Sequence, residues 1–272
     1  MGGTDPCSRR DKASMFPIRL PLGALALTLV SGTASAAMVH VQFDNPIFNG
    51  VPTPSYDAVT ITYPALGTGA PRSVSTAAGR FQGTASNVVG VSPSIFTDSV
   101  DDLFMYCYDV YEPVGSGWGV DYTINLDGER ARTLDFLGAV NAVLNQGRSE
   151  YDVYAWLHPT SGAMAAAVQL GIWESKYEAD GWNLGSGSFL ATDIDATTQV
   201  YLNSFLAAID GSFALDGRYA MTLEAVGAQD MITGDPPANV PEPGMPALLG
   251  AAATAALWAA RRRRPGIRTA PL

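Results

Sequence analysis

Apolar and polar residues alternate along several short segments in the first half of the chain. The alternation is clearest in residues 39–44 (VHVQFD) and 58–63 (AVTITY), and it predicts strands with one buried face. Similar segments predict further strands at residues 80–91, 102–110 and 120–126. Prolines separate several of these segments and mark loops, so the first half is expected to be rich in antiparallel strands.

The spacing of apolar residues changes to a helical period in the second half. Apolar side chains recur three or four positions apart in residues 133–147, 161–181 and 195–211, which predicts three helices. Thr133 is expected to cap the first helix and Gly147 to end it.

Residues 218–226 return to the alternation of a strand. An antiparallel β-rich first half, a helical block and a final strand predict the α+β class. We expect residues 37–234 to form a single compact domain, because about 200 residues can bury a substantial core.

The N-terminal segment is typical of a secretory signal peptide. Basic residues precede an apolar core at residues 20–30, which is too short to span a bilayer, and Ala34-Ser35-Ala36 is a small-x-small cleavage site. We therefore expect Ala34 and Ala36 to direct cleavage and residues 1–36 to be a removed leader. Translation could begin at Met1 or at Met15.

The C-terminal segment combines three features in a fixed order. A Pro-rich linker at residues 235–244 contains Pro241, Glu242 and Pro243, and an apolar segment at 245–260 follows it. That segment has a marginal length for a transmembrane helix. A basic tail at residues 261–272 is expected to stay cytoplasmic, because it begins with four consecutive arginines: Arg261, Arg262, Arg263 and Arg264.

This order of Pro-Glu-Pro motif, short apolar helix and terminal arginine cluster resembles the PEP-CTERM sorting signal. The resemblance implies processing by an exosortase, a membrane-embedded transpeptidase-like enzyme, in a Gram-negative bacterium that makes exopolysaccharide. It also implies delivery to the cell surface or biofilm matrix after transient anchoring in the inner membrane. A Pro-rich linker before an ordinary tail anchor is the alternative.

Removing the expected leader and tail changes the charge of the protein. The whole chain has a formal charge of −10, whereas residues 37–243 keep 24 acidic and only seven basic residues, a charge of −17. Such a surface argues against nucleic-acid binding, which needs Lys and Arg. Cys7 belongs to the leader, so Cys107 remains as a single cysteine and no disulfide is expected.

Cys107 lies in the strand-like segment Phe104–Val110 (FMYCYDV), and a buried free cysteine ordinarily acts as a small apolar residue. Gln169 interrupts the apolar segment 165–174 (AAAVQLGIWE), and a buried amide needs hydrogen-bond partners. A packed thiol and a hydrogen-bonded glutamine would account for both residues separately.

Together, the Tyr-Cys-Tyr element and the Gln-x-x-Ile-Trp element resemble the thioester domain of bacterial surface adhesins. The best-known of these adhesins are Gram-positive and carry a different anchoring signal, so the PEP-CTERM tail departs from their pattern. The resemblance implies that the sulfur of Cys107 bonds to the side-chain carbonyl of Gln169. Amines from a protein, a polyamine or an amino sugar would then be captured covalently, without enzymatic turnover. Four aromatic side chains are expected to keep water from the bond: Tyr106, Tyr108, Trp156 and Trp173.

Other interpretations remain open at this point. A non-covalent structural or carbohydrate-binding matrix protein would need only an inert buried thiol. An enzyme could use Cys107 as nucleophile and His158 as base, but no catalytic or cofactor motif accompanies them, and we expect neither enzymatic activity nor a cofactor. Clustered acids could offer oxygen ligands to calcium, although their spacing matches no known loop: Asp98, Asp101, Asp102, Asp193 and Asp195.

Overall fold

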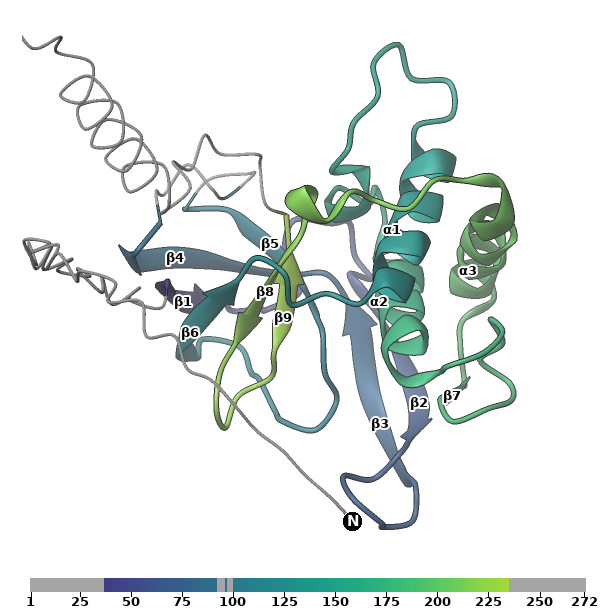
Figure 1. Cartoon of the computed structure of the whole chain (residues 1–272), viewed down its shortest axis with the longest axis horizontal. Helices are drawn as coiled ribbons and strands as arrows, with labels where there is room; N and C mark the ends of the chain where they lie inside the picture. The colour runs from purple at the N-terminus through teal and green to yellow at the C-terminus, as the bar shows by residue number, and fades with distance from the viewer. Residues whose placement is uncertain (1–36, 92–95, 97–99, 235–272) are drawn as a thin grey trace, which may run out of the picture. The chain divides into compact units, whose positions relative to one another are not determined.

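The computed structural model describes residues 37–91, 96 and 100–234, which belong to one compact unit. Strands and helices both contribute to it, and the predicted α+β class is confirmed (Figure 1). The expected leader, Pro-rich linker, transmembrane segment and basic tail all lie outside the described residues. None of the helices in the described ranges has the length and apolarity needed to cross a bilayer.

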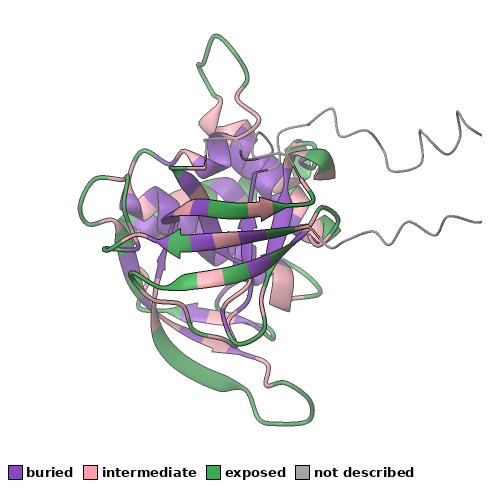
Figure 2. Ribbon diagram, turned by 90° about the vertical axis from the view of Figure 1, so that its left-hand side faces the viewer, coloured by how far each residue is buried: buried purple, intermediate pink, exposed green. Residues whose placement is uncertain are grey.

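Six antiparallel strands close into a small barrel. Their order is β1-β4-β5-β9-β8-β6, so strands from the beginning and the end of the domain lie side by side. Buried residues alternate with more exposed ones along β1 and β6, and Figure 2 shows such alternating bands along the strands. The strands are β1 (Met38–Phe43), β4 (Phe81–Val89), β5 (Leu103–Cys107), β6 (Gly119–Asn125), β8 (Met221–Glu224) and β9 (Met231–Thr233).

A second antiparallel sheet has the order β3-β2-β7. It contains β2 (Tyr56–Tyr63), β3 (Arg72–Gly79) and the short β7 (Leu190–Thr192). Strand β2 shows the buried–exposed alternation that its sequence predicts, with Val59 and Ile61 almost fully buried. This sheet packs against helix α2, which contacts both β2 and β3.

Among the described residues, three α-helices form the other side of the core: α1 (Ala131–Leu144), α2 (Gly162–Tyr177) and α3 (Ala196–Ala208). Helix α2 is buried along nearly its whole length, and it contacts α1, α3, both sheets and the strand β5. Its N-terminus is capped by Ser161, whose hydroxyl accepts the backbone N–H of Met164. A helix buried on all sides needs apolar residues around its circumference, which explains why Gln169 stands out in its sequence.

The local predictions for α1 need correction. Thr133 is not the N-cap, because the helix begins at Ala131 and Arg130 occupies the capping position. Thr133 is instead fully buried in the first turn, where its hydroxyl bonds to that of Ser175 in α2 at 2.8 Å. The predicted last strand, residues 218–226, contains β8, whereas β9, which pairs with β8, was not predicted.

Candidate thioester site

Cys107 is the last residue of strand β5 and is only 2% exposed. On one side β5 pairs with β9, where Cys107 lies opposite Met231. On the other side the pairing with β4 extends only to Met105, which lies opposite Phe81, the first residue of β4. The backbone of Cys107 therefore extends past the end of β4 and needs other hydrogen-bond partners.

Gln169 supplies those partners from helix α2. Its Oε1 accepts the backbone N–H of Cys107 at 2.9 Å, and its Nε2 donates to the carbonyl oxygen of Cys107 at 2.8 Å. The side chain is fully buried. The carboxamide thus pairs with Cys107 as a neighbouring strand would, and it ties α2 to the end of β5.

The sulfur of Cys107 faces a different glutamine. Its Sγ lies 2.8 Å from Oε1 of Gln229, which precedes strand β9. Because a C=O bond is about 1.23 Å long, the sulfur is within about 4 Å of the Gln229 carbonyl carbon. The two glutamines therefore contact different parts of Cys107: Gln169, the expected partner of the sulfur, binds the backbone, and Gln229 contacts the thiol.

Several contacts hold Gln229 in this orientation. Its Nε2 donates to the backbone oxygen of Asp109 at 2.7 Å, and its own backbone oxygen accepts from the hydroxyl of Tyr122 at 2.9 Å. The Asp109 carboxylate accepts the backbone N–H of Asp230 at 2.7 Å, which fixes the residue after Gln229. The carboxamide is thus oriented toward the thiol by contacts from β6 and the loop after β5.

The protonation state of the thiol follows from its surroundings. Burial, and secondly the negative charge of Asp109, raise the pKa of Cys107 well above its ordinary value. The group is therefore a thiol at neutral pH and donates to Gln229 Oε1. Attack on the carbonyl would have to be coupled to loss of the thiol proton, because the free thiolate is disfavoured here.

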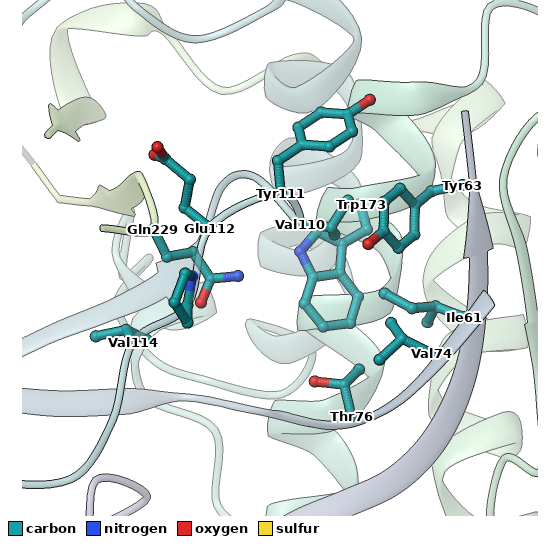
Figure 3. Close-up of a pocket in the computed structure, with 11 residues that line it drawn as sticks. Ile61, Tyr63, Val74, Thr76, Val110, Tyr111, Glu112, Val114, Trp173 and Gln229 are labelled. Carbon is teal, nitrogen blue, oxygen red and sulfur yellow. The ribbon is translucent and has the colours of Figure 1, made fainter. Parts of the chain in front are cut away.

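Two adjoining cavities give access to this pair. An inner cavity of about 150 Å³ is lined by Cys107 and Gln229, and an outer cavity of about 330 Å³ is lined by Gln229 and Glu112. Trp173 lines both cavities, and Figure 3 shows its indole beside the Gln229 side chain. The outer cavity reaches the surface at Val74, which is 42% exposed. A small molecule could approach the Gln229 carbonyl through this cavity.

The four aromatic residues expected to protect the bond have different positions. Only Trp173 lines the inner cavity, together with Phe48 and Phe81. Tyr106 and Trp156 stack on each other with ring centroids 5.9 Å apart. Tyr108 bonds through its hydroxyl to the first turn of α1. Tyr106, Tyr108 and Trp156 are therefore core residues, whereas Trp173 borders the Cys107–Gln229 pair.

His158 and the candidate calcium ligands lie apart from the thiol cavity. His158 lines a separate cavity of about 370 Å³, with its Nδ1 3.5 Å from an Asp152 oxygen. Asp98 lies outside the described residues, and the candidate ligands within them form no group of three. In the described part of the chain, the one such group is Asp109, Glu112 and Asp230, whose oxygens already accept backbone N–H groups.

The sequence carries a signal for Gln229 that the thioester resemblance did not include. Val168-Gln169-Leu170-Gly171-Ile172-Trp173 has the pattern apolar-Gln-x-x-apolar-apolar, and Ala228-Gln229-Asp230-Met231-Ile232 repeats its beginning with the same spacing. The second copy leads into a short strand rather than lying in a helix. Treating both copies as candidates would have identified both glutamines that contact Cys107.

Comparisons with known proteins add no further constraint: no family model, curated protein or solved structure matches this chain.

Proposed function

We propose that this protein is a covalent adhesion module whose reactive group is a thioester between Cys107 and Gln229. The observation that carries the proposal is the contact of 2.8 Å between the buried Cys107 sulfur and the side-chain oxygen of Gln229. Amides are weak electrophiles, so such a bond forms only where the fold holds sulfur and carbonyl together at high effective concentration. The hydrogen bonds from Gln169 and around Gln229 supply that preorganisation.

The chemistry balances without a cofactor. The sulfur adds to the Gln229 carbonyl carbon, the C–N bond breaks, and the amide nitrogen leaves with the thiol proton as ammonia. A primary amine that enters through the outer cavity then attacks the same carbon. The C–S bond breaks, the thiol of Cys107 is restored, and the partner is joined to residue 229 by an amide. Each molecule reacts once, so this is capture rather than enzymatic turnover.

Export and sorting complete the proposed function. A signal peptide ending at Ala36, the Pro241-Glu242-Pro243 motif and the terminal arginines support delivery to the surface or exopolysaccharide matrix by an exosortase-type enzyme. An acidic body favours amine partners that carry positive charge, such as lysine-rich proteins or polyamines. In the oxidising compartment outside the cytoplasm, a sulfur bound in a thioester is not available for oxidation to a disulfide.

Intact mass spectrometry of the purified domain tests the proposal. The wild type should be lighter than its sequence mass by one ammonia, and its thiol should resist alkylation. Methylamine should add its own mass and release an alkylatable thiol. Gln229→Glu keeps the size of the side chain but has no ammonia to lose, and it should show the full mass and a thiol that alkylates on unfolding.

Gln199→Glu is the matched control, because Gln199 lies on α3 and its side chain contacts only Asn203 among the bonds described. This variant should remain lighter by one ammonia. If Gln229→Glu still loses ammonia, the acyl group belongs to another residue. If the wild type has its full mass and a free thiol, the alternative of a non-covalent matrix or carbohydrate-binding protein replaces this proposal.

A further inference from the structure

The indole N–H of Trp173 is a buried donor without an acceptor in the described part of the chain. The residue is only 2% exposed, and its Nε1 has no hydrogen-bond partner among the residues that the structure describes. Leaving a buried donor unpaired destabilises the folded state, so a native fold that keeps one needs an explanation.

The position of this donor suggests what it serves. Trp173 lines both the inner cavity at Cys107 and the outer cavity at Gln229. In Figure 3 its indole nitrogen lies on the ring edge that faces the Gln229 side chain. Trp173 also follows Gln169 by one helical turn on α2, so the helix that holds the Cys107 backbone holds the indole as well.

The resting amide offers a further clue. Gln229 Oε1 accepts the thiol of Cys107 at 2.8 Å. When the sulfur adds to the carbonyl carbon, the thiol proton leaves with the nitrogen. The oxygen then loses its donor at the moment when negative charge develops on it. A new donor is needed at that oxygen, in a cavity with little water.

We propose that the Trp173 indole N–H donates a hydrogen bond to the Gln229 oxygen in the tetrahedral intermediate, as an oxyanion-hole donor. The same bond would serve twice: when Cys107 displaces ammonia, and when an amine displaces Cys107. In both steps the oxygen becomes negatively charged as the fourth bond to carbon forms, and it returns to a carbonyl when the leaving group departs. This inference rests on the thioester proposed above.

The rate of methylamine capture by Trp173→Phe tests the role. Loss of one oxyanion donor typically slows a reaction about 10²–10³-fold, and we expect a decrease of that order. If Trp173 only excluded water and amines, the smaller phenylalanine ring would open the cavity and capture would become faster. The direction of the change therefore separates a donor from a barrier.

Trp156→Phe is the matched control. Trp156 also has a buried Nε1 without a partner among the described residues, but it stacks on Tyr106 and does not line either cavity. Its capture rate should stay within about tenfold of the wild type. Thioester formation needs the same donor. The proposal would therefore also be supported if a folded Trp173→Phe protein kept its full sequence mass while Trp156→Phe was lighter by one ammonia.

The outcomes that overturn the proposal are distinct from those for the thioester itself. A lighter wild type with an unchanged or faster capture rate in Trp173→Phe refutes the role of the indole and leaves the thioester intact. A wild type with full mass overturns both. Should Trp173→Phe fail to fold, proton NMR of the wild type decides: the Trp173 indole N–H signal should shift when methylamine opens the thioester, and an unmoved signal refutes the contact.

Discussion

The paired hydrogen bonds between Gln169 and the Cys107 backbone predict a large loss of stability in Gln169→Ala. The substitution removes both bonds and leaves a buried N–H and a buried carbonyl of Cys107 unpaired. Neither barrel neighbour can replace them, because β4 pairs no further than Met105 and the next N–H toward β9 belongs to Tyr108, which donates to Asp230.

The magnitude follows from these two groups. Each buried backbone group left without a partner costs about 1–3 kcal/mol, so Gln169→Ala should lose about 2–6 kcal/mol. That is a large part of the about 5–15 kcal/mol that stabilises a typical domain. Urea unfolding measures it, and both proteins should carry Cys107→Ser so that no covalent link contributes.

Gln169→Glu gives a sharper version of the same test. The new carboxylate keeps an acceptor for the Cys107 N–H, but when ionised it places an oxygen against the Cys107 carbonyl where the amide had a donor. Protonation restores a donor, so this variant should approach wild-type stability as the pH falls through the pKa of the introduced carboxyl group. A loss below about 1 kcal/mol in Gln169→Ala, or no recovery of Gln169→Glu in acid, would refute the strand-like pairing.

Two further predictions concern helix α2. Burial raises the pKa of Glu174 from 4.5 to about 7, so the folded state binds more protons than the unfolded state in that window. Stability should therefore fall as the pH rises from about 4.5 to 7, and Glu174→Gln should reduce this slope in urea titrations; an unchanged slope would contradict the assignment. A Cβ at Gly171 would overlap the Phe136 ring, so Gly171→Ala should lose about 1–3 kcal/mol, whereas Gly211→Ala, in open space, should lose none.

Periodicity predicted the elements whose side chains alternate between core and solvent. Strands β1 and β2 lie within two residues of their predicted starts, and the three helices overlap the predicted segments. Strand β3 was not predicted, because most residues of its sequence, RSVSTAAG, are polar or small and show no alternation. Its pairing with β2 along its full length stabilises it as a strand. Strands β7 and β9 have three residues each, too few to show a period.

The site was predictable in part from residue types that differ from their neighbours. Cys107 stands out as the single cysteine of the expected mature chain and Gln169 as a polar residue in an apolar segment, and the structure brings them into contact. Which atoms meet could not be predicted, since it depends on where β4 ends beside β5. The repeated Gln pattern marks Gln229 as a candidate, but its contact with Cys107 spans 122 positions and depends on barrel closure by β9, which local spacing does not predict.

The place of Gln229 in the chain determines which part of the protein would bear mechanical load. A captured partner would be attached at residue 229, five residues before Gly234, the last residue described ahead of the expected C-terminal linker. Tension between that partner and a C-terminal tether would run along β9 alone, which β5 and β8 hold by hydrogen bonds on both sides. The three helices and the second sheet would lie outside the line of force, so the attachment could persist under flow even if they unfolded.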